Sequence, residues 1–172
     1  MNLLELGQRI GVEGFLHCEE LNKLVELAAN RDVLEVGSFK GLSAWGMGMV
    51  ARRLTCCDTF KANSAGQQQM PEYTTLDEFT RAIRRYNHVR VFPIASEVAE
   101  GVLNGEKFEM VFIDANHSYE QVKADIERWW PRVLPGGVFV MHDFAHPDFP
   151  GVEQAANEAF GPPTEGSTLV TL

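Results

Sequence analysis

Short apolar segments alternate with amphipathic stretches along most of this chain, and that alternation limits the possible folds more than any other feature. Apolar runs with few polar interruptions are typical of parallel strands that are covered on both faces. The amphipathic stretches between them have the length of crossover helices. The sequence therefore predicts an α/β protein whose doubly wound, mostly parallel sheet is flanked by helices. The predicted strands span 32–37, 54–60, 89–95, 108–114, 138–143 and 168–172.

Helices are expected between these strands, and two of them have recognisable N-terminal signals. Thr75 and Glu78 form a capping box, and Ser118 precedes a stretch with apolar residues at helical spacing. The sequence has no internal repeat and no linker, so its 172 residues are predicted to form one domain. That domain would comprise a helical segment, 1–30, and a core, 31–172. The predicted helices span 19–30, 41–52, 75–86, 118–131 and 152–160.

The charge balance and the cysteines argue against several classes of protein. The chain has 15 Lys and Arg against 24 Asp and Glu, a formal net charge of −9, which does not suit a nucleic-acid-binding protein. Its one basic cluster, Arg81, Arg84, Arg85 and Arg90, is interpreted as a solvated helix face. No leader peptide or apolar run of membrane-spanning length is visible. Three cysteines without disulfide or metal-binding spacing favour a cytoplasmic protein.

Polar residues follow the predicted strands at the points where the strands end. Glu35 and Gly37 end the first strand, Asp58 the second, Ser96 the third, Asp114 the fourth, and His142 with Asp143 the fifth. In a doubly wound sheet the carboxyl ends of the strands meet at one edge, and ligands bind beyond that edge. The sequence therefore predicts a functional site there.

The segment from Gly37 to Gly41 is predicted to bind the anionic end of a ligand. Gly37 would let the backbone approach a ligand without a Cβ, and Gly41 begins a helix whose free N–H groups favour an anion. Dinucleotide-binding turns have three closely spaced glycines, whereas this turn has the spacing Gly-x-x-x-Gly, which makes NAD a poorer candidate. Asp58 lies where an acidic residue accepts ribose hydroxyls in nucleoside-binding sheets.

The most specific segment runs from Phe112 to Asp125 and is followed by Pro135-Gly136-Gly137 and His142-Asp143-Phe144. Together with Glu35-Val-Gly37-Ser38, Gly41-Leu-Ser43 and Asp58-Thr-Phe60, it resembles class I S-adenosylmethionine-dependent methyltransferases. The resemblance extends from Gly14 to Val152 and is closest to small-molecule O-methyltransferases related to the macrocin and catechol O-methyltransferases. It implies a Rossmann-like sheet, S-adenosylmethionine as the cofactor and a small-molecule acceptor.

The resemblance also implies roles for individual residues. Glu35, Gly37, Ser38, Gly41 and Ser43 would form the methionine end of the cofactor site, Asp58 would hold the ribose, and Ala95 and Ser96 would border the adenine. Asp114 and His117 would face the methyl-transfer centre. Residues 61–73 and 144–150 are expected to form the acceptor wall.

Related enzymes often hold a divalent cation between a carboxylate that ends strand four and an acidic or amide pair that ends strand five. Asp114 and Asp143 could share such an ion, because adjacent strands lie about 4.8 Å apart, and their oxygens would suit Mg²⁺ or Ca²⁺. This sequence departs from the pattern, since His142 takes the first place of the pair. In the metal-free alternative, His117 or His142 is the base that deprotonates the acceptor.

Two functions from other classes stay open at this stage. A metal-dependent hydrolase could use Asp114, His117, His142, Asp143 and His146, although the glycine turn would then have no role. A cofactor-binding module without catalysis is the second, because methyltransferases of this class usually end with two antiparallel strands and only 168–172 qualifies. The sequence does not identify the acceptor, and a homodimer is left open.

Overall fold

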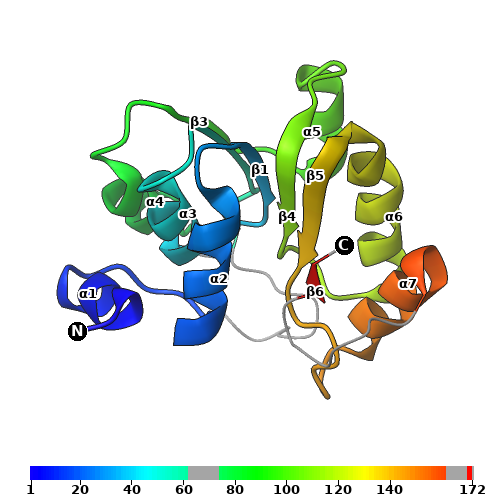
Figure 1. Cartoon of the computed structure of the whole chain (residues 1–172), viewed down its shortest axis with the longest axis horizontal. Coiled ribbons are helices and arrows are strands. Elements are labelled where there is room, and N and C mark those ends of the chain that lie inside the picture. The colour runs from blue at the N-terminus through cyan, green and yellow to red at the C-terminus, as the bar shows by residue number, and fades with distance from the viewer. Residues whose placement is uncertain (62–73, 162–169, 172) are drawn as a thin grey trace.

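The computed structural model describes residues 1–61, 74–161 and 170–171 (Figure 1). A six-stranded sheet in the order β3-β2-β1-β4-β5-β6 forms its centre. The first five strands are parallel, and β6 runs antiparallel to β5. The predicted mostly parallel α/β sheet is thus confirmed, with its short final strand. The strands are β1 (Asp32–Val36), β2 (Arg53–Cys57), β3 (Val89–Phe92), β4 (Phe108–Ile113), β5 (Val133–Met141) and β6 (Val170–Thr171).

The strand order reverses between β1 and β4. The chain moves outward from β1 to β3 and then returns, so that β4 pairs with the other side of β1. In doubly wound sheets such a switch point opens a crevice beyond the carboxyl ends of the two strands. Val36 lies opposite Ile113 at the end of this pair. The residues that follow Val36 and Ile113 are therefore neighbours at the crevice.

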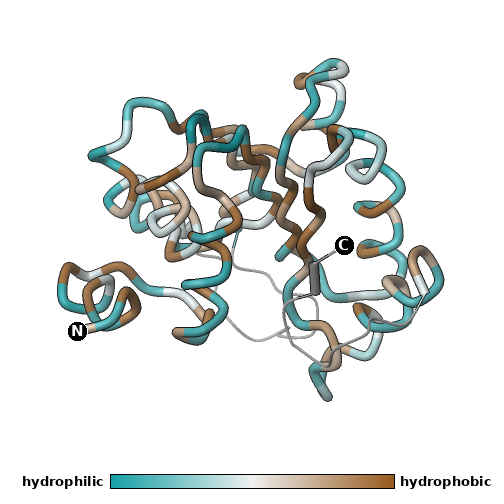
Figure 2. Tube along the Cα trace, in the orientation of Figure 1, coloured by the Kyte–Doolittle hydropathy of each residue, from teal (hydrophilic) through white to brown (hydrophobic). Residues whose placement is uncertain are grey.

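Helices cover both faces of the sheet (Figure 1). One face packs against α1 (Leu3–Arg9), α2 (Cys18–Ala28), α3 (Leu42–Gly48) and α4 (Leu76–Ile83), and the other against α5 (Ser96–Val102), α6 (Tyr119–Trp129) and α7 (Pro150–Phe160). Successive strand residues serve the two faces in turn, since Val33 joins the first core and Leu34 the second. Figure 2 accordingly shows strands that are hydrophobic along their length and helices of mixed hydropathy.

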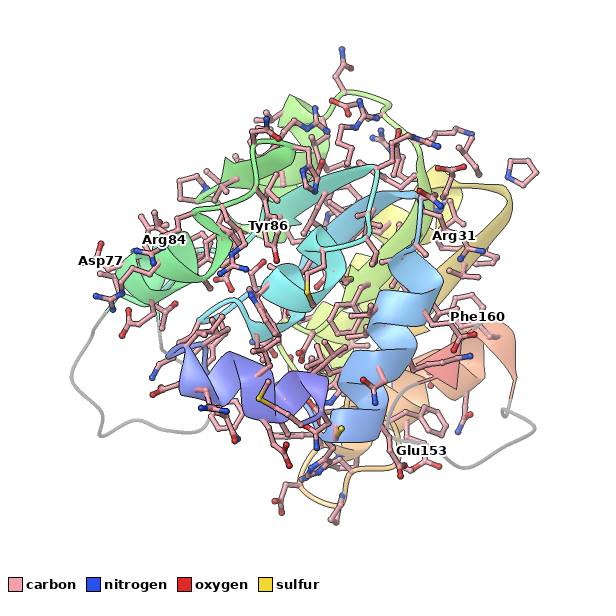
Figure 3. The ribbon with its side chains drawn as sticks, turned by 60° about the vertical axis from the view of Figure 1, so that its left-hand side comes forward. Arg31, Asp77, Arg84, Tyr86, Glu153 and Phe160 are labelled. Carbon is pink, nitrogen blue, oxygen red and sulfur yellow. The ribbon has the colours of Figure 1, made fainter. Side chains whose placement is uncertain are left out.

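Two glycines in α3 let neighbouring side chains approach closely. A Cβ on Gly46 would lie 2.7 Å from a methyl group of Leu21, and one on Gly48 would lie 2.7 Å from the Tyr86 ring. Tyr86, which is labelled in Figure 3, donates a hydrogen bond from its hydroxyl to the Trp45 carbonyl at 3.0 Å. These contacts fix α3, and with it the turn that precedes α3, against the rest of the first core.

Several elements differ from their predicted bounds. β3 ends at Phe92 because Pro93 has no N–H to offer the sheet, so Ser96, expected at a strand end, is instead the first residue of α5. β5 begins at Val133, and the predicted turn at 135–137 forms a bulge within it where the register with β4 shifts. Thr75 and Ser118 are the expected N-caps of α4 and α6, but neither side chain makes a capping hydrogen bond.

Other predictions concern the ends and the surroundings of the sheet. Residues 62–73 of the expected acceptor wall lie outside the described residues. Residues 144–149 lie in the connection between β5 and α7, and Pro150 is the first residue of α7. Cys56 and Cys57 are buried, unpaired thiols of the core, as predicted. Among the described helices, none has both the length and the apolar character needed to cross a membrane.

Candidate functional site

The carboxyl ends of the central strands meet at one edge, as predicted, and backbone hydrogen bonds join the residues that follow them. The Gly37 N–H donates to the Cys57 carbonyl (2.9 Å), the Asp114 N–H to the Val36 carbonyl (2.8 Å), and the His142 N–H to the Ile113 carbonyl (3.1 Å). Each of these bonds extends the sheet ladder by one residue. The glycine turn, Asp114 and His142 therefore lie side by side on neighbouring strand ends.

Asp58 holds the glycine turn in place from the end of β2. Its Oδ2 accepts hydrogen bonds from the backbone N–H groups of Ser38 (2.7 Å) and Phe39 (2.8 Å), and its Oδ1 accepts one from Phe60 (2.6 Å). The predicted contact between Asp58 and a ribose stays a prediction, which the spare lone pairs of a carboxylate allow.

Glu35 holds the same turn through its side chain at the end of β1. Its carboxylate is fully buried and accepts hydrogen bonds from the hydroxyls of Ser38 (2.5 Å) and Ser43. Burial raises the pKa of Glu35 to about 7, although the two serine hydrogen bonds act in the opposite direction. Gly41, with a left-handed φ of +91°, caps the N-terminus of α3 as predicted. Two carboxyl groups therefore shape the turn that was predicted to bind the cofactor.

The reason for a glycine at position 37 differs from the expected one. A Cβ there would lie 2.0 Å from the carbonyl oxygen of Asp114 and 2.7 Å from the Cα of Ala115, and φ is +89°. The space beside Gly37 is thus filled by the backbone that follows β4. The expectation that a ligand fills it is corrected, because the neighbouring strand end already occupies the position.

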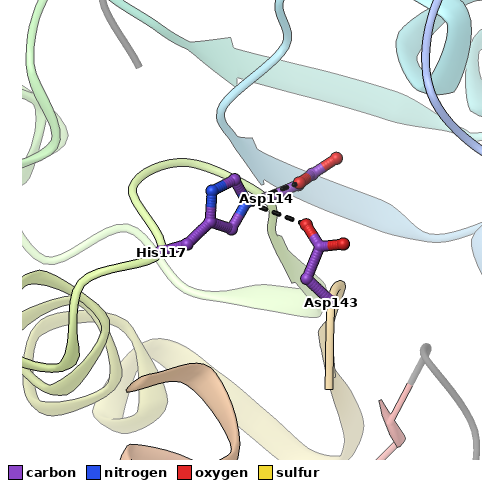
Figure 4. Close-up of side chains that lie close together, drawn as sticks. All are labelled: Asp114, His117 and Asp143. Carbon is purple, nitrogen blue, oxygen red and sulfur yellow. Dashed lines mark ion pairs between the residues drawn. The ribbon is translucent and has the colours of Figure 1, made fainter. Parts of the chain in front are cut away.

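Two histidines and two aspartates form one cluster at the ends of β4 and β5. Figure 4 shows three of them, Asp114, His117 and Asp143. His117 Nε2 lies 2.8 Å from Asp143 Oδ2 and 3.7 Å from Asp114 Oδ1. His142 Nδ1 lies 3.1 Å from the same Asp143 oxygen and 3.4 Å from Asp114 Oδ1. Asp143 has a φ of +57°, a conformation that is uncommon outside glycine and that occurs at functional turns. The structure therefore brings together Asp114, His117, His142 and Asp143, and their role in methyl transfer stays a prediction.

The charges of the cluster are set by these ion pairs. Burial lowers the pKa of both imidazoles, but pairing with Asp114 and Asp143 outweighs burial and raises the pKa of His117 to about 9 and that of His142 to about 11. Burial alone would raise the pKa of each aspartate, yet the same pairing holds both pKa values below their usual range. At neutral pH the two rings are cations beside two carboxylates.

Two residues at the site were missed by sequence reasoning. Glu20, in the first turn of α2, places Oε2 3.3 Å from His142 Nε2. Phe149 stacks on His117 with the ring centroids 4.2 Å apart, and His146 stacks on Phe149 at 4.9 Å. Phe149 lies in the predicted acceptor wall, but no sequence pattern indicated its contact with His117. For Glu20, the only signal was its place three residues after His17 at the start of a predicted helix.

Ser96 is held between α5 and α6. Its hydroxyl donates a hydrogen bond to Asp125 and accepts one from the Trp129 indole N–H at 2.8 Å. Asp125 is buried and also pairs with Arg128 at 2.8 Å. Asp125 therefore links α6 to α5 through the Ser96 hydroxyl. The expected position of Ala95 and Ser96 beside an adenine stays a prediction.

A match to a known family decides the class of this protein. The profile of a family described as "Methyltransferase domain" matches residues 34–144, more than half of the chain. The chain belongs to the methyltransferase-domain family. The matched range contains the glycine turn, Asp58 and the His–Asp cluster, and it confirms the predicted class of S-adenosylmethionine-dependent methyltransferase. No curated protein matches the sequence.

Solved structures with the same fold have low sequence identity to this methyltransferase. An O-methyltransferase from Bacillus cereus, solved with SAH, matches with a TM-score of 0.67 and 16% identity over 94% of this chain and 78% of its own. A putative O-methyltransferase from Klebsiella pneumoniae gives 0.65 and 16% over 94% and 77%. The TDP-rhamnose 3′-O-methyltransferase CalS11 of calicheamicin biosynthesis gives 0.60 and 16% over 90% and 76%. These matches confirm the Rossmann-like fold.

The family assignment also bears on the two alternative functions. Neither a hydrolase nor a non-catalytic module is favoured by the comparisons. Among the described residues, the acidic and histidine group compact enough for a metal ion consists of Asp114, His117 and Asp143. His146, which the hydrolase hypothesis required, is not part of that group.

Proposed function

We propose that this methyltransferase transfers the methyl group of S-adenosylmethionine to a hydroxyl group of a small molecule. The observation that carries the proposal is the His117–Asp143 pair, with 2.8 Å between Nε2 and Oδ2, on the strand end next to the glycine turn. A histidine held by a carboxylate is the arrangement that general-base catalysis requires. The O-methyltransferases with the same fold support oxygen as the acceptor atom.

The donor atoms of the cluster do not fit Mg²⁺. Asp114, His117 and Asp143 each offer one atom within 4.8 Å of the others. Mg²⁺ prefers an octahedron of oxygen ligands, but a third of this set is an imidazole nitrogen. Both carboxylates are also paired with His142 Nδ1, at 3.1 and 3.4 Å. A metal-independent reaction therefore agrees better with the charges present, and we assign the function of the base to a histidine.

His117 is better suited to this function than His142. The His142 side chain is only 8% exposed and has carboxylates near both ring nitrogens, whereas the His117 side chain is 24% exposed. Asp143 holds Nε2 of His117, so we propose that Nδ1 accepts the proton of the acceptor hydroxyl. S-adenosylmethionine supplies a methyl group on a sulfonium and leaves as SAH, with the electron pair of the broken C–S bond kept on sulfur. Phe149, stacked on His117, covers one face of the ring.

We also propose that the enzyme acts in the cytoplasm. Its three cysteines, Cys18, Cys56 and Cys57, are unpaired thiols, which is the usual state of cysteines in a reducing compartment.

The proposal is tested with purified protein, S-adenosylmethionine and a panel of catechols, phenols and sugars in buffer with EDTA. We expect an O-methylated product and SAH in equal amounts, with a rate that neither EDTA nor added Mg²⁺ changes. Mass spectrometry measures both products. Loss of activity in EDTA and its recovery with Mg²⁺ would contradict the metal-independent route. N-methylated products would contradict the acceptor class, and calorimetric binding of NADH but not SAH would contradict the cofactor.

A further inference from the structure

Glu20 connects the N-terminal helices to the His–Asp cluster. Its side chain is 8% exposed, and its Oε2 accepts a hydrogen bond from the His17 backbone N–H at 2.7 Å. The same oxygen lies 3.3 Å from Nε2 of His142. One carboxylate therefore contacts both the start of α2 and a residue at the end of β5, which are far apart in the sequence.

The contacts of Glu20 hold the His142 ring from the side that the aspartates do not reach. Asp114 and Asp143 face Nδ1, and Glu20 faces Nε2. The backbone N–H of His142 is bonded to the Ile113 carbonyl at 3.1 Å, so the base of the side chain is fixed as well. A ring with carboxylates at both nitrogens cannot turn over without losing one of these contacts.

Capping of α2 does not by itself account for a buried carboxylate. An acidic residue can stabilise a helix N-terminus while its carboxylate stays in water. Glu19, in the same turn, is exposed in this way. Taking a carboxylate out of water is costly unless it is paired and hydrogen-bonded. His142 is a pairing partner for Glu20 at this position. His142 also contacts Asp114 and Asp143, so the pair connects Glu20 to the candidate site.

We infer that Glu20 is a positioning residue for methyl transfer, which fixes the His142 ring and through it the Asp114 and Asp143 carboxylates. The inference rests on the proposed function, because Asp114 and Asp143 would affect methyl transfer by holding the proposed base, His117. Glu20 Oε2 lies 3.3 Å from Nε2 of His142, so its effect on the cluster should pass through His142.

The test is a double-mutant cycle of Glu20→Gln and His142→Gln, with Glu19→Gln as the matched control in the same helical turn. We expect Glu20→Gln to lower kcat by about 10- to 100-fold, within the range for contacting residues, and to leave the affinity for SAH unchanged. In the His142→Gln background the same change should have little further effect. Glu19→Gln should match the wild type. Circular dichroism and thermal unfolding establish that each variant is folded.

An equal loss of kcat in both backgrounds, or no loss at all, would overturn the inference and leave Glu20 as a helix cap. If Glu20→Gln does not fold, Glu20→Asp replaces it, because aspartate keeps the charge but withdraws it from the ring. A readout without turnover separates this inference from the proposed function. The SAH-bound wild type should show a slowly exchanging Nε2 proton of His142 by NMR, and Glu20→Ala, which has no acceptor atom at this position, should lose it. Retention of that proton would also overturn the inference.

Discussion

Replacement of His117 by glutamine should reduce kcat for methyl transfer by roughly 100- to 10,000-fold, the usual contribution of a general base. Glutamine keeps much of the volume of the ring but cannot take the proton of the acceptor. Binding of SAH should change little, because in the described structure His117 contacts Asp114, Asp143 and Phe149 rather than the glycine turn. Steady-state kinetics and calorimetry measure the two quantities.

The pH dependence of this enzyme should reveal the same residue. The pKa of His117 is raised to about 9, so at pH 7 most of the enzyme carries a protonated ring that cannot act as a base. The rate should therefore rise about tenfold per pH unit above pH 7 and level off near pH 9. An unperturbed histidine would give a plateau above about pH 6.5 instead.

The free energy of unfolding should fall as the pH rises, whereas the rate of methyl transfer should increase. The folded-state pKa of His117 lies above its unfolded value, so its ion pairs stabilise the fold fully below about pH 6.5, and this contribution is lost as the pH rises through about 9.

His88→Gln is the matched control for the kinetic effect of His117→Gln, since His88 contacts the Gly48 carbonyl at 3.0 Å, away from the cluster. A rate that is unchanged in His117→Gln, or equally reduced in His88→Gln, would show that His117 is not the base.

Gly37→Ala should destabilise the whole domain, not only weaken cofactor binding. The new Cβ would lie 2.0 Å from the Asp114 carbonyl oxygen, and neither backbone can move without breaking the ladder between β1 and β4. Overpacking and the left-handed φ together predict a loss of about 2–5 kcal/mol. For a domain of this size that corresponds to a decrease in Tm of roughly 5–15 °C. Differential scanning calorimetry measures the change.

The control for Gly37→Ala is Gly136→Ala. Gly136 also has a positive φ, +79°, but a Cβ there would meet nothing within 4 Å. The difference between the two variants therefore isolates the steric clash from the backbone strain. Equal changes in Tm would mean that the Asp114 backbone yields at little cost, and the close approach of the two strand ends would then have no structural importance.

The sheet could be predicted because each strand is a short apolar run whose ends coincide with polar residues. The functional edge followed from the same pattern, since parallel strands bring their carboxyl ends together whatever helices lie between them. Asp114 and His142 could therefore be predicted as site residues from the sequence. α5 was not predicted, because it has seven residues, contains Gly101 and has Ala95 rather than a polar residue as its N-cap.

The contacts made by helices could not be derived in the same way. Glu20 approaches His142 only because α2 packs over the sheet, and the sequence gives no measure of how one helix is placed along its axis. Asp58 was predicted to bind a ligand, and the structure adds its three backbone partners because the end of β2 lies beside the glycine turn. Such details depend on tertiary packing rather than on local pattern.

The burial of Glu35 has a consequence for the heat of cofactor binding. Its pKa of about 7 means that near neutral pH about half of the molecules carry a proton beneath the serine hydroxyls of the turn. A charged ligand group that binds at the turn shifts the pKa of this carboxyl group, so that binding exchanges a proton with the buffer. The calorimetric enthalpy of S-adenosylmethionine binding should therefore vary with the ionisation enthalpy of the buffer at pH 7, and Glu35→Gln should abolish that variation.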